Sequence, residues 1–306
     1  MGPGGMNIVF FGSGSFGLPV LESLEQVTLV VSQPDRPAGR RRRATPTPIA
    51  AHAEASGLPL LRVKDVNDPA AMETIRSAQA DAWVVIAFGQ KLSPALLADR
   101  FAINLHGSLL PRWRGAAPIH HAVMAGDTQT GVSVITLADR MDAGDVLAAA
   151  TIDIALCDTT GDLHDSLSQL GPDCVHHVLQ DFATGVVHAQ PQIESAATAA
   201  PKLSRQSAAI SPDMSAIDLR CRINGCAPWP GCDGLIDGQP LRFARATSSE
   251  TPAQAGTLSS EGVLGCTGGA VRLLEVQPRG GRVMPFADWA NGCQHSWPVS
   301  FEAARP

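Results

Sequence analysis

The sequence predicts an α/β chain, in which a doubly wound, mostly parallel sheet is followed by a small C-terminal β-barrel. Residues 7–155 alternate continuously apolar runs with helical stretches, which is typical of a parallel sheet buried on both faces. Residues 234–276 carry short strand-like pieces between Gly-rich turns, which is typical of a small antiparallel barrel. Residues 190–206 are small, polar and Pro-containing, as linkers usually are. We therefore expect a domain over 1–189, a linker over 190–206 and a barrel domain over 207–306.

Each element follows from a local pattern. Continuous apolar and β-branched runs predict strands at 7–11, 27–32, 82–88, 101–106 and 132–137. Helices are expected from about Pro19 and over 49–56, and the barrel strands at 234–237, 240–246, 256–260 and 270–276. Apolar spacings of three and four over 159–182, interrupted at Gly171 and Pro172, predict a helix pair or a kinked helix.

Composition and charge narrow the class of protein. The 306 residues, 44% hydrophobic and 17% charged, predict a folded chain of about two domains. A formal charge of -6 provides no overall attraction to nucleic acid, so a local basic patch would have to bind it. Seven cysteines without zinc-finger spacing predict reduced thiols, a cytoplasmic location and no metal site. No apolar run approaches the ~18 residues of a membrane span, so no membrane association is expected.

The segment AINLHGSLLPRWRGAAP (102–118) is the strongest chemical motif, because it leaves a predicted buried strand and enters a long loop. Side chains alternate along a strand, so Asn104 and His106 project from one face, roughly 7 Å apart. An amide and an imidazole aimed together at a carbonyl suit acyl or formyl transfer, since they can stabilise a developing oxyanion. Either residue alone is more often structural, and the pair carries the prediction.

A second loop follows the strand predicted at 132–137, and it holds Asp139, Asp142 and Asp145. Asp beside Gly is common in ordinary turns. A carboxylate at a neighbouring strand end could nevertheless reach His106 and stabilise its protonated ring. Asp142, within Met-Asp-Ala-Gly, is our candidate.

A Gly-rich turn offers a competing interpretation. Residues 12–17 read GSGSFG after a strand, and Asp35 lies near the distance expected for a ribose-binding carboxylate. By itself this pattern would indicate a dinucleotide-binding oxidoreductase. Such an enzyme has no need of the Asn104 and His106 pair.

Several of these segments together resemble the methionyl-tRNA formyltransferase family. The resemblance rests on NLHGSLLPRWRGAAPI, TGVSVITLADRMDAGDVL and SQPDRPAGR, and continues in order through ATAAPKLS, PWPG and RLLEVQP. It implies a formyltransferase-like, Rossmann-type domain followed by an OB-like barrel that binds tRNA. Two segments depart from the family: its usual Thr-Pro pair is absent from the turn at 12–17, and QSAAISPD replaces acidic residues and Ile-Asp-Trp after the linker.

The resemblance also implies roles for individual residues. Asn104, His106 and Asp142 match the catalytic trio of the family. Two segments match its folate site, and the residues expected to bind the cofactor are Ser108, Leu109, Leu110, Pro111, Val85, Ile86, Phe88 and Gly89. The loop over 34–48 matches the insertion that approaches the tRNA acceptor stem, and its expected tRNA contacts are Arg36, Arg40, Arg41, Arg42 and Arg43. Consecutive arginines suit a phosphate backbone.

The implied activity is transfer of a formyl group from 10-formyltetrahydrofolate to the amino group of methionyl-initiator tRNA, for translation initiation. We expect the amine to attack the formyl carbon directly, Asn104 and protonated His106 to hold the oxyanion, and a monomer to act without metal. Two enzymes could share this site: an amino-sugar-nucleotide formyltransferase and a 10-formyltetrahydrofolate hydrolase. A catalytically silent tRNA- or folate-binding protein is the alternative from another class.

Overall fold

The computed structural model describes residues 5–38 and 43–303, which form two compact units. Unit 1 comprises the residues up to Arg114 together with Gly131–Thr151 and Asp165–Thr198. Unit 2 comprises Gly115–Thr130, Ile152–His164 and the residues from Ala199 onward. The chain therefore passes from one unit to the other five times.

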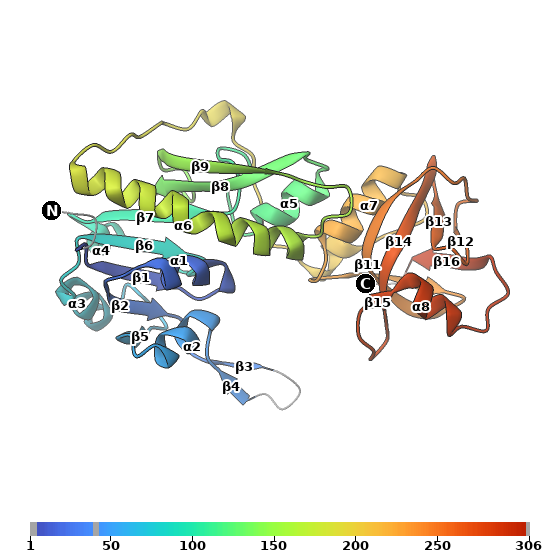
Figure 1. The fold of residues 1–306 in the computed structure, drawn as a ribbon, viewed down its shortest axis with the longest axis horizontal. Helices are drawn as coiled ribbons and strands as arrows, with labels where there is room; N and C mark the ends of the chain where they lie inside the picture. The colour runs from blue at the N-terminus through green and yellow to red at the C-terminus, as the bar shows by residue number, and fades with distance from the viewer. Residues whose placement is uncertain (1–4, 39–42, 304–306) are drawn as a thin grey trace. The chain divides into compact units, whose positions relative to one another are not determined.

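A seven-stranded sheet forms the centre of unit 1, with the strand order β5-β2-β1-β6-β7-β8-β9 (Figure 1). In this order the strands are β5 (Leu60–Arg62), β2 (Val27–Ser32), β1 (Ile8–Gly12), β6 (Ala82–Ile86), β7 (Phe101–His106), β8 (Gln129–Thr136) and β9 (Val146–Asp153). The first five strands are parallel, and β8 is antiparallel to β7. β1 and β6 are buried along their whole length because helices cover a parallel sheet on both faces. The predicted mostly parallel sheet is confirmed.

Helices cover both faces of this sheet. They are α1 (Leu18–Ser23), α2 (Pro48–Ala55), α3 (Pro69–Ser77), α4 (Pro94–Leu97) and the part of α6 (Thr160–Thr184) that belongs to unit 1. On one face, a buried cluster joins β1, β6 and Ala102 of β7 with α3 and α4. On the other face, Ile49 of α2 lies where a side chain at Gly12 would point. Since alternate residues of a strand share a face, Asn104 and His106 lie on the same face as Ala102.

The helix α6 corrects part of the expectation for 159–182. It is one helix of 25 residues with Pro172 inside it, and it is not divided into a pair. Proline removes one helical hydrogen bond, so packing must compensate for the loss. Gly171 permits that packing, because a Cβ there would come within 2.8 Å of both Leu105 and Val20. Close contact with β7 and α1 therefore accompanies the uninterrupted helix.

The strands of unit 2 form a closed antiparallel barrel in the order β11-β10-β16-β12-β13-β14, with β14 pairing back to β11 and β15 added to β14. The bounds are β10 (Cys232–Ile236), β11 (Gln239–Ser249), β12 (Thr257–Leu258), β13 (Val263–Cys266), β14 (Gly269–Pro278), β15 (Met284–Pro285) and β16 (Val299–Ala303). The helices are α5 (Pro118–Met124), α7 (Ala216–Gly225) and α8 (Phe286–Asn291). Leu219 and Ile223 of α7 are fully buried in the barrel core, as is Phe243 of β11. Phe301 of β16 is almost fully buried there. The predicted barrel is confirmed.

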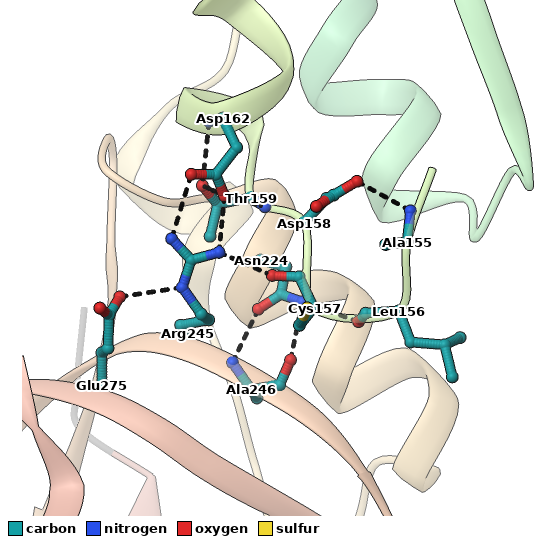
Figure 2. A network of polar contacts seen from close by, with 10 residues as sticks. All are labelled: Ala155, Leu156, Cys157, Asp158, Thr159, Asp162, Asn224, Arg245, Ala246 and Glu275. Atoms are coloured by element: carbon teal, nitrogen blue, oxygen red, sulfur yellow. Dashed lines mark hydrogen bonds and ion pairs between the residues drawn. The ribbon is translucent and has the colours of Figure 1, made fainter. Parts of the chain in front are cut away.

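A polar network in unit 2 is centred on Arg245 of β11 (Figure 2). Its guanidinium donates to both carboxylate oxygens of Asp162, at 2.6 and 3.1 Å, and to Glu275 at 2.9 Å. Beside it, the buried Asn224 exchanges two hydrogen bonds with the backbone of Ala246. An ion pair therefore joins the start of α6 to the barrel wall, and side-chain hydrogen bonds join the helix α7 to it.

Replacing Asp162 with Asn is expected to lower the free energy of unfolding at pH 7 by about 1 kcal/mol, after allowing for solvent screening of a carboxylate that is 40% exposed. Burial raises the pKa of Asp162, but hydrogen bonds from Arg245 and Thr159 outweigh burial and bring that pKa down to about 2. A depressed carboxyl pKa stabilises the fold above its unfolded value, and this contribution is lost as the pH falls toward 2. Urea unfolding of both proteins between pH 2 and 7 would measure the difference.

The control for this experiment is Asp233→Asn, which removes another exposed partner of a barrel arginine, Arg242. Exposed pairs contribute little, so the control should lose less than about 0.5 kcal/mol. An Asp162→Asn deficit of the same size at pH 2 and pH 7 would contradict the explanation.

Two further features bear on the class of protein. Within residues 5–38 and 43–303, no helix is both long and apolar enough to cross a membrane. All seven cysteines are free thiols, and five of them are buried.

Candidate functional site

Asn104 and His106 are placed by β7, which lies between β6 and β8 in the sheet. Asn104 pairs with Val85 of β6 on one side and with Ile135 of β8 on the other. His106 ends the strand opposite Ser133. Within the described part of the chain, the Asn104 side chain makes no hydrogen bond. Its amide is thus available to a ligand at the carboxyl end of the sheet, where open α/β sheets bind theirs.

His106 is held between two oxygen atoms. Its Nδ1 lies 3.6 Å from the Asp142 carboxylate, and its Nε2 lies 2.9 Å from the carbonyl oxygen of Trp113. The His106 side chain is 7% exposed and that of Asp142 is 14% exposed, so little water screens the pair. The 2.9 Å distance at Nε2 is that of a hydrogen bond, whereas 3.6 Å at Nδ1 is an ion-pair distance and too long for a hydrogen bond. The arrangement therefore places the imidazole beside a carboxylate that can orient it.

The loop that carries Asp142 is shaped by local backbone demands. Asp142 itself has φ 53°, in the left-handed region that Asp tolerates better than most residues. A Cβ at Gly144 would overlap the carbonyl oxygen of Thr136, so this position has no room for a side chain. Asp145 closes the loop through two hydrogen bonds with Thr136, of 2.9 and 3.0 Å. The residues that the sequence marks as turn formers therefore hold the backbone that carries the Asp142 carboxylate.

The predicted folate segment 108–111 divides into a fixed end and an accessible end. Ser108 is completely buried, its hydroxyl donates to the Arg112 carbonyl at 2.6 Å, and its own carbonyl accepts from Ser133 at 2.8 Å. Ser108 thus fixes the loop. Leu109, Leu110 and Pro111 are half-buried and can still offer apolar surface to a ligand.

In the second predicted folate segment, Val85, Ile86 and Phe88 are buried, with exposures of 6, 0 and 2%. Their side chains pack in the core, and the Phe88 ring contacts Phe11 edge-on. Gly89 is exposed and has φ 78°. A ligand at this turn would therefore meet backbone groups of 86–90 rather than these three side chains.

A pocket of about 380 Å³ lies beside that turn, and its lining residues are Gln33, Pro34, Asp35, Arg36, Lys64, Gly89 and Gln90. It brings Arg36, a predicted tRNA contact, next to Gly89, a predicted folate contact. Arg36 also donates to the side chain of Gln33. Gln90 ends the stretch that resembles the border of the family's folate site. The sequence did not single out Gln33 or Lys64, because each is an ordinary polar residue that follows a strand.

Two of the predicted tRNA-binding arginines, Arg36 and Arg43, belong to a two-stranded ribbon formed by β3 (Arg36–Ala38) and β4 (Arg43–Thr45). Arg36 and Arg43 are exposed at its ends. Arg40, Arg41 and Arg42 lie outside the described residues. The two described arginines present charge to solvent, as phosphate binding requires.

The Gly-rich turn at 12–17 serves packing in this structure. A side chain at Gly17 would come within 3.1 to 3.3 Å of Phe10 and Ile86, and the Gly14 N–H bonds to the Ala87 carbonyl at 3.3 Å. Asp35, the other part of the dinucleotide pattern, pairs with Arg62 at 2.8 Å. The turn thus has a packing role, and Asp35 has an ion-pair partner. Among the described residues, no group of three or more His, Cys, Asp or Glu is placed to hold a metal ion.

Two groups near His106 and Asp142 were not predicted from the sequence. The Trp113 carbonyl is a backbone atom, which sequence cannot distinguish from any other. Gln192 donates to the carbonyl oxygens of Asp142 and Gly144, at 2.8 and 2.6 Å, from within the segment expected to be a linker. No local signal marks this residue.

Comparison with protein families gives two matches. Residues 6–179 match the formyl transferase family, and residues 202–294 match the formyl transferase C-terminal domain. The chain is 38% identical over 298 residues to the methionyl-tRNA formyltransferase of Xylella fastidiosa strain 9a5c, covering 94% of this chain and 97% of that protein. It is 37% identical over 307 residues to that of Nitrobacter hamburgensis, covering 97 and 99%.

Two solved structures resemble the fold. HypX from Aquifex aeolicus in complex with tetrahydrofolic acid superposes with a TM-score of 0.65 and 17% identity over 98% of this chain. The match covers 51% of HypX, so this chain spans about half the length of HypX. WlaRD, a sugar 3N-formyl transferase solved with dTDP and 5-N-formyl-THF, gives a TM-score of 0.66 and 12% identity over 87% of this chain and 96% of its own. At these identities the likeness concerns the fold alone.

Proposed function

Because this chain belongs to the methionyl-tRNA formyltransferases, we propose that it moves the formyl group of 10-formyltetrahydrofolate onto the amino group of methionine carried by initiator tRNA. The observation that carries this proposal is the 3.6 Å pair of His106 and Asp142 at the end of the strand that also bears Asn104. These three side chains form the proposed catalytic group.

The surroundings of this group suit the formyl donor. Leu109, Leu110 and Pro111 offer half-buried apolar surface, and the exposed turn at Gly89 offers backbone donors and acceptors. Ligand sites commonly combine apolar walls with a few placed polar groups of this kind. When bound, 10-formyltetrahydrofolate supplies a formyl carbon attached to nitrogen, ready for attack by an amine.

The chain contributes electrostatic stabilisation and orientation to the reaction. The Asn104 amide donates to the formyl oxygen as negative charge develops on it, and the protonated His106 ring adds positive charge nearby. Asp142 keeps that ring oriented and charged. An α-amino group has a reference pKa of about 7.7 to 8.0, so part of the acceptor is neutral near pH 7 and can attack. The proton that it releases goes to Asp142 or to water. The bond between the formyl carbon and N10 of the donor then breaks, and N10 takes up a proton, which leaves tetrahydrofolate.

Binding of tRNA is assigned to two regions. The arginines of 36–43, of which Arg36 and Arg43 are described and exposed, contact phosphates near the acceptor end. The barrel domain over 207–306 adds a second tRNA-binding surface, supported by its match to the formyl transferase C-terminal domain. The free thiols support a reducing, cytoplasmic setting.

The decisive assay offers formyl-labelled 10-formyltetrahydrofolate with methionyl-tRNA, with an amino sugar nucleotide, or with water alone. Label is expected on methionyl-tRNA. Replacing Arg43 with Ala should raise the tRNA concentration needed for half-maximal rate without changing that for the donor. Label on the sugar, or released formate as the main product, would assign one of the two alternative activities instead. Donor binding without any turnover would indicate the silent binding protein.

A further inference from the structure

The segment 190–198, which follows α6, is hydrogen-bonded at both ends to other parts of unit 1. Gln190 exchanges two backbone hydrogen bonds of 2.9 Å with Val146, just after the Asp142 loop. Thr198 accepts from the backbone N–H of Trp113 at 2.9 Å through its hydroxyl, and from that of Arg114 at 2.8 Å through its carbonyl. The segment thus contacts both loops that supply an oxygen to His106.

Gln192 lies between these two ends. Its amide nitrogen donates to the carbonyl oxygens of Asp142 and Gly144, at 2.8 and 2.6 Å. The two carbonyls belong to a loop whose central residue has φ 53° and whose glycine tolerates no side chain. Such a loop is held only where its surroundings determine it strongly. The Gln192 side chain supplies part of that support, in addition to the hydrogen bonds between Asp145 and Thr136.

Arg114 determines which way the Gln192 amide points. The guanidinium of Arg114 is 9% exposed, and its Nε donates to the Gln192 Oε1 at 2.9 Å. Its two other nitrogens bind Glu194 at 2.9 and 3.1 Å, and Glu194 also accepts from Arg140 at 2.8 Å. Since Arg can only donate, the amide oxygen must face Arg114 and the amide nitrogen must face the two carbonyls.

We propose that Gln192 is a positioning residue for formyl transfer, which holds the Asp142 loop so that the carboxylate stays against His106. The proposal rests on the function proposed above. A displacement of about 1 Å at a reacting group can cost about 100-fold in rate, even when the altered residue lies away from the chemistry. The Asp142 to His106 distance is already 3.6 Å, so further separation would remove the ion pair.

The test compares Gln192→Ala and Gln192→Met with the unchanged enzyme in steady-state formylation of methionyl-tRNA. Met keeps the length of the side chain but removes both hydrogen-bond donors. Both variants are expected to lower kcat by about 10- to 100-fold, with KM for donor and tRNA changed less than about threefold. Gln129→Ala is the matched control, because its amide donates to the exposed Asp153 in a hairpin, and its kcat should not change.

A coupling measurement separates positioning from a general structural role. Gln192→Ala is combined with Asp142→Asn, and if Gln192 acts through Asp142 the double variant should be no slower than Asp142→Asn alone. Losses that multiply would overturn the proposal, as would full activity in Gln192→Met. Thermal unfolding of every variant shows whether it is folded. If Asp142→Asn itself left the rate unchanged, the proposed function of the trio would fail instead, so the two failures are distinguishable.

Discussion

His106→Ala is expected to reduce kcat for formylation of methionyl-tRNA by about 100- to 10,000-fold, the range typical of a lost acid-base or charge-stabilising group. The ring is nearly buried and lies 3.6 Å from the Asp142 carboxylate and 2.9 Å from the Trp113 carbonyl, so truncation to Ala removes the imidazole that the proposed mechanism uses. Single-turnover transfer of a labelled formyl group, with saturating donor and tRNA, measures the chemical step directly.

The control for this experiment is His176→Ala. His176 is another histidine of unit 1, half-buried where His106 is buried, and it bonds to Ser23 on α1 instead of to a member of the trio. The control should keep its turnover, and thermal unfolding should show that both variants are folded. A His106→Ala enzyme that is folded and transfers formyl at the normal rate would remove the basis of the proposed mechanism.

Asn104→Ala is expected to reduce kcat by about 100- to 1,000-fold, the cost of removing one donor from an oxyanion site. Donor binding should change far less, because the hydrogen bond strengthens only as charge develops on the formyl oxygen. The stability cost should be small, since the Asn104 side chain makes no hydrogen bond among the described residues. Separate measurement of kcat and of KM for the donor distinguishes these effects.

Asn67→Ala provides the comparison for Asn104→Ala. The Asn67 amide donates to a backbone carbonyl at Lys91 on the surface of unit 1, so its loss should leave kcat intact. An equal fall in kcat for both variants, or a rise in KM with no change in kcat for Asn104→Ala, would argue against an oxyanion role.

Much of the sheet could be predicted from the sequence because its signal is local. β1 and β6 are apolar at every position, and that pattern alone indicates a parallel strand covered on both faces. The pair of Asn104 and His106 also follows from local geometry, since the alternation of a strand places them on one face. Asp142 stood out through its turn and through resemblance to a family.

Other features depend on contacts that are distant in sequence. Gln192 reaches the Asp142 loop from a segment whose small, polar composition indicated only a linker. Pro172 predicted an interruption, but the contact surface around Gly171 keeps α6 in one piece. The GSGSFG turn satisfied a dinucleotide pattern, yet side chains at Gly12 and Gly17 would come too close to Phe10 and Ile86. In each case tertiary packing outweighs the local rule.

The five crossings of the chain between its two units affect how the polypeptide can be synthesised and divided. During synthesis, most residues of unit 1 leave the ribosome first. The stretch that completes this unit, which ends at Thr198, leaves only after two segments of unit 2. No single protease cut can release either half as an intact body. Truncated versions made for crystallisation or for domain-swap experiments should therefore aggregate, unless the segments that pass between the two units are redesigned together with the cut.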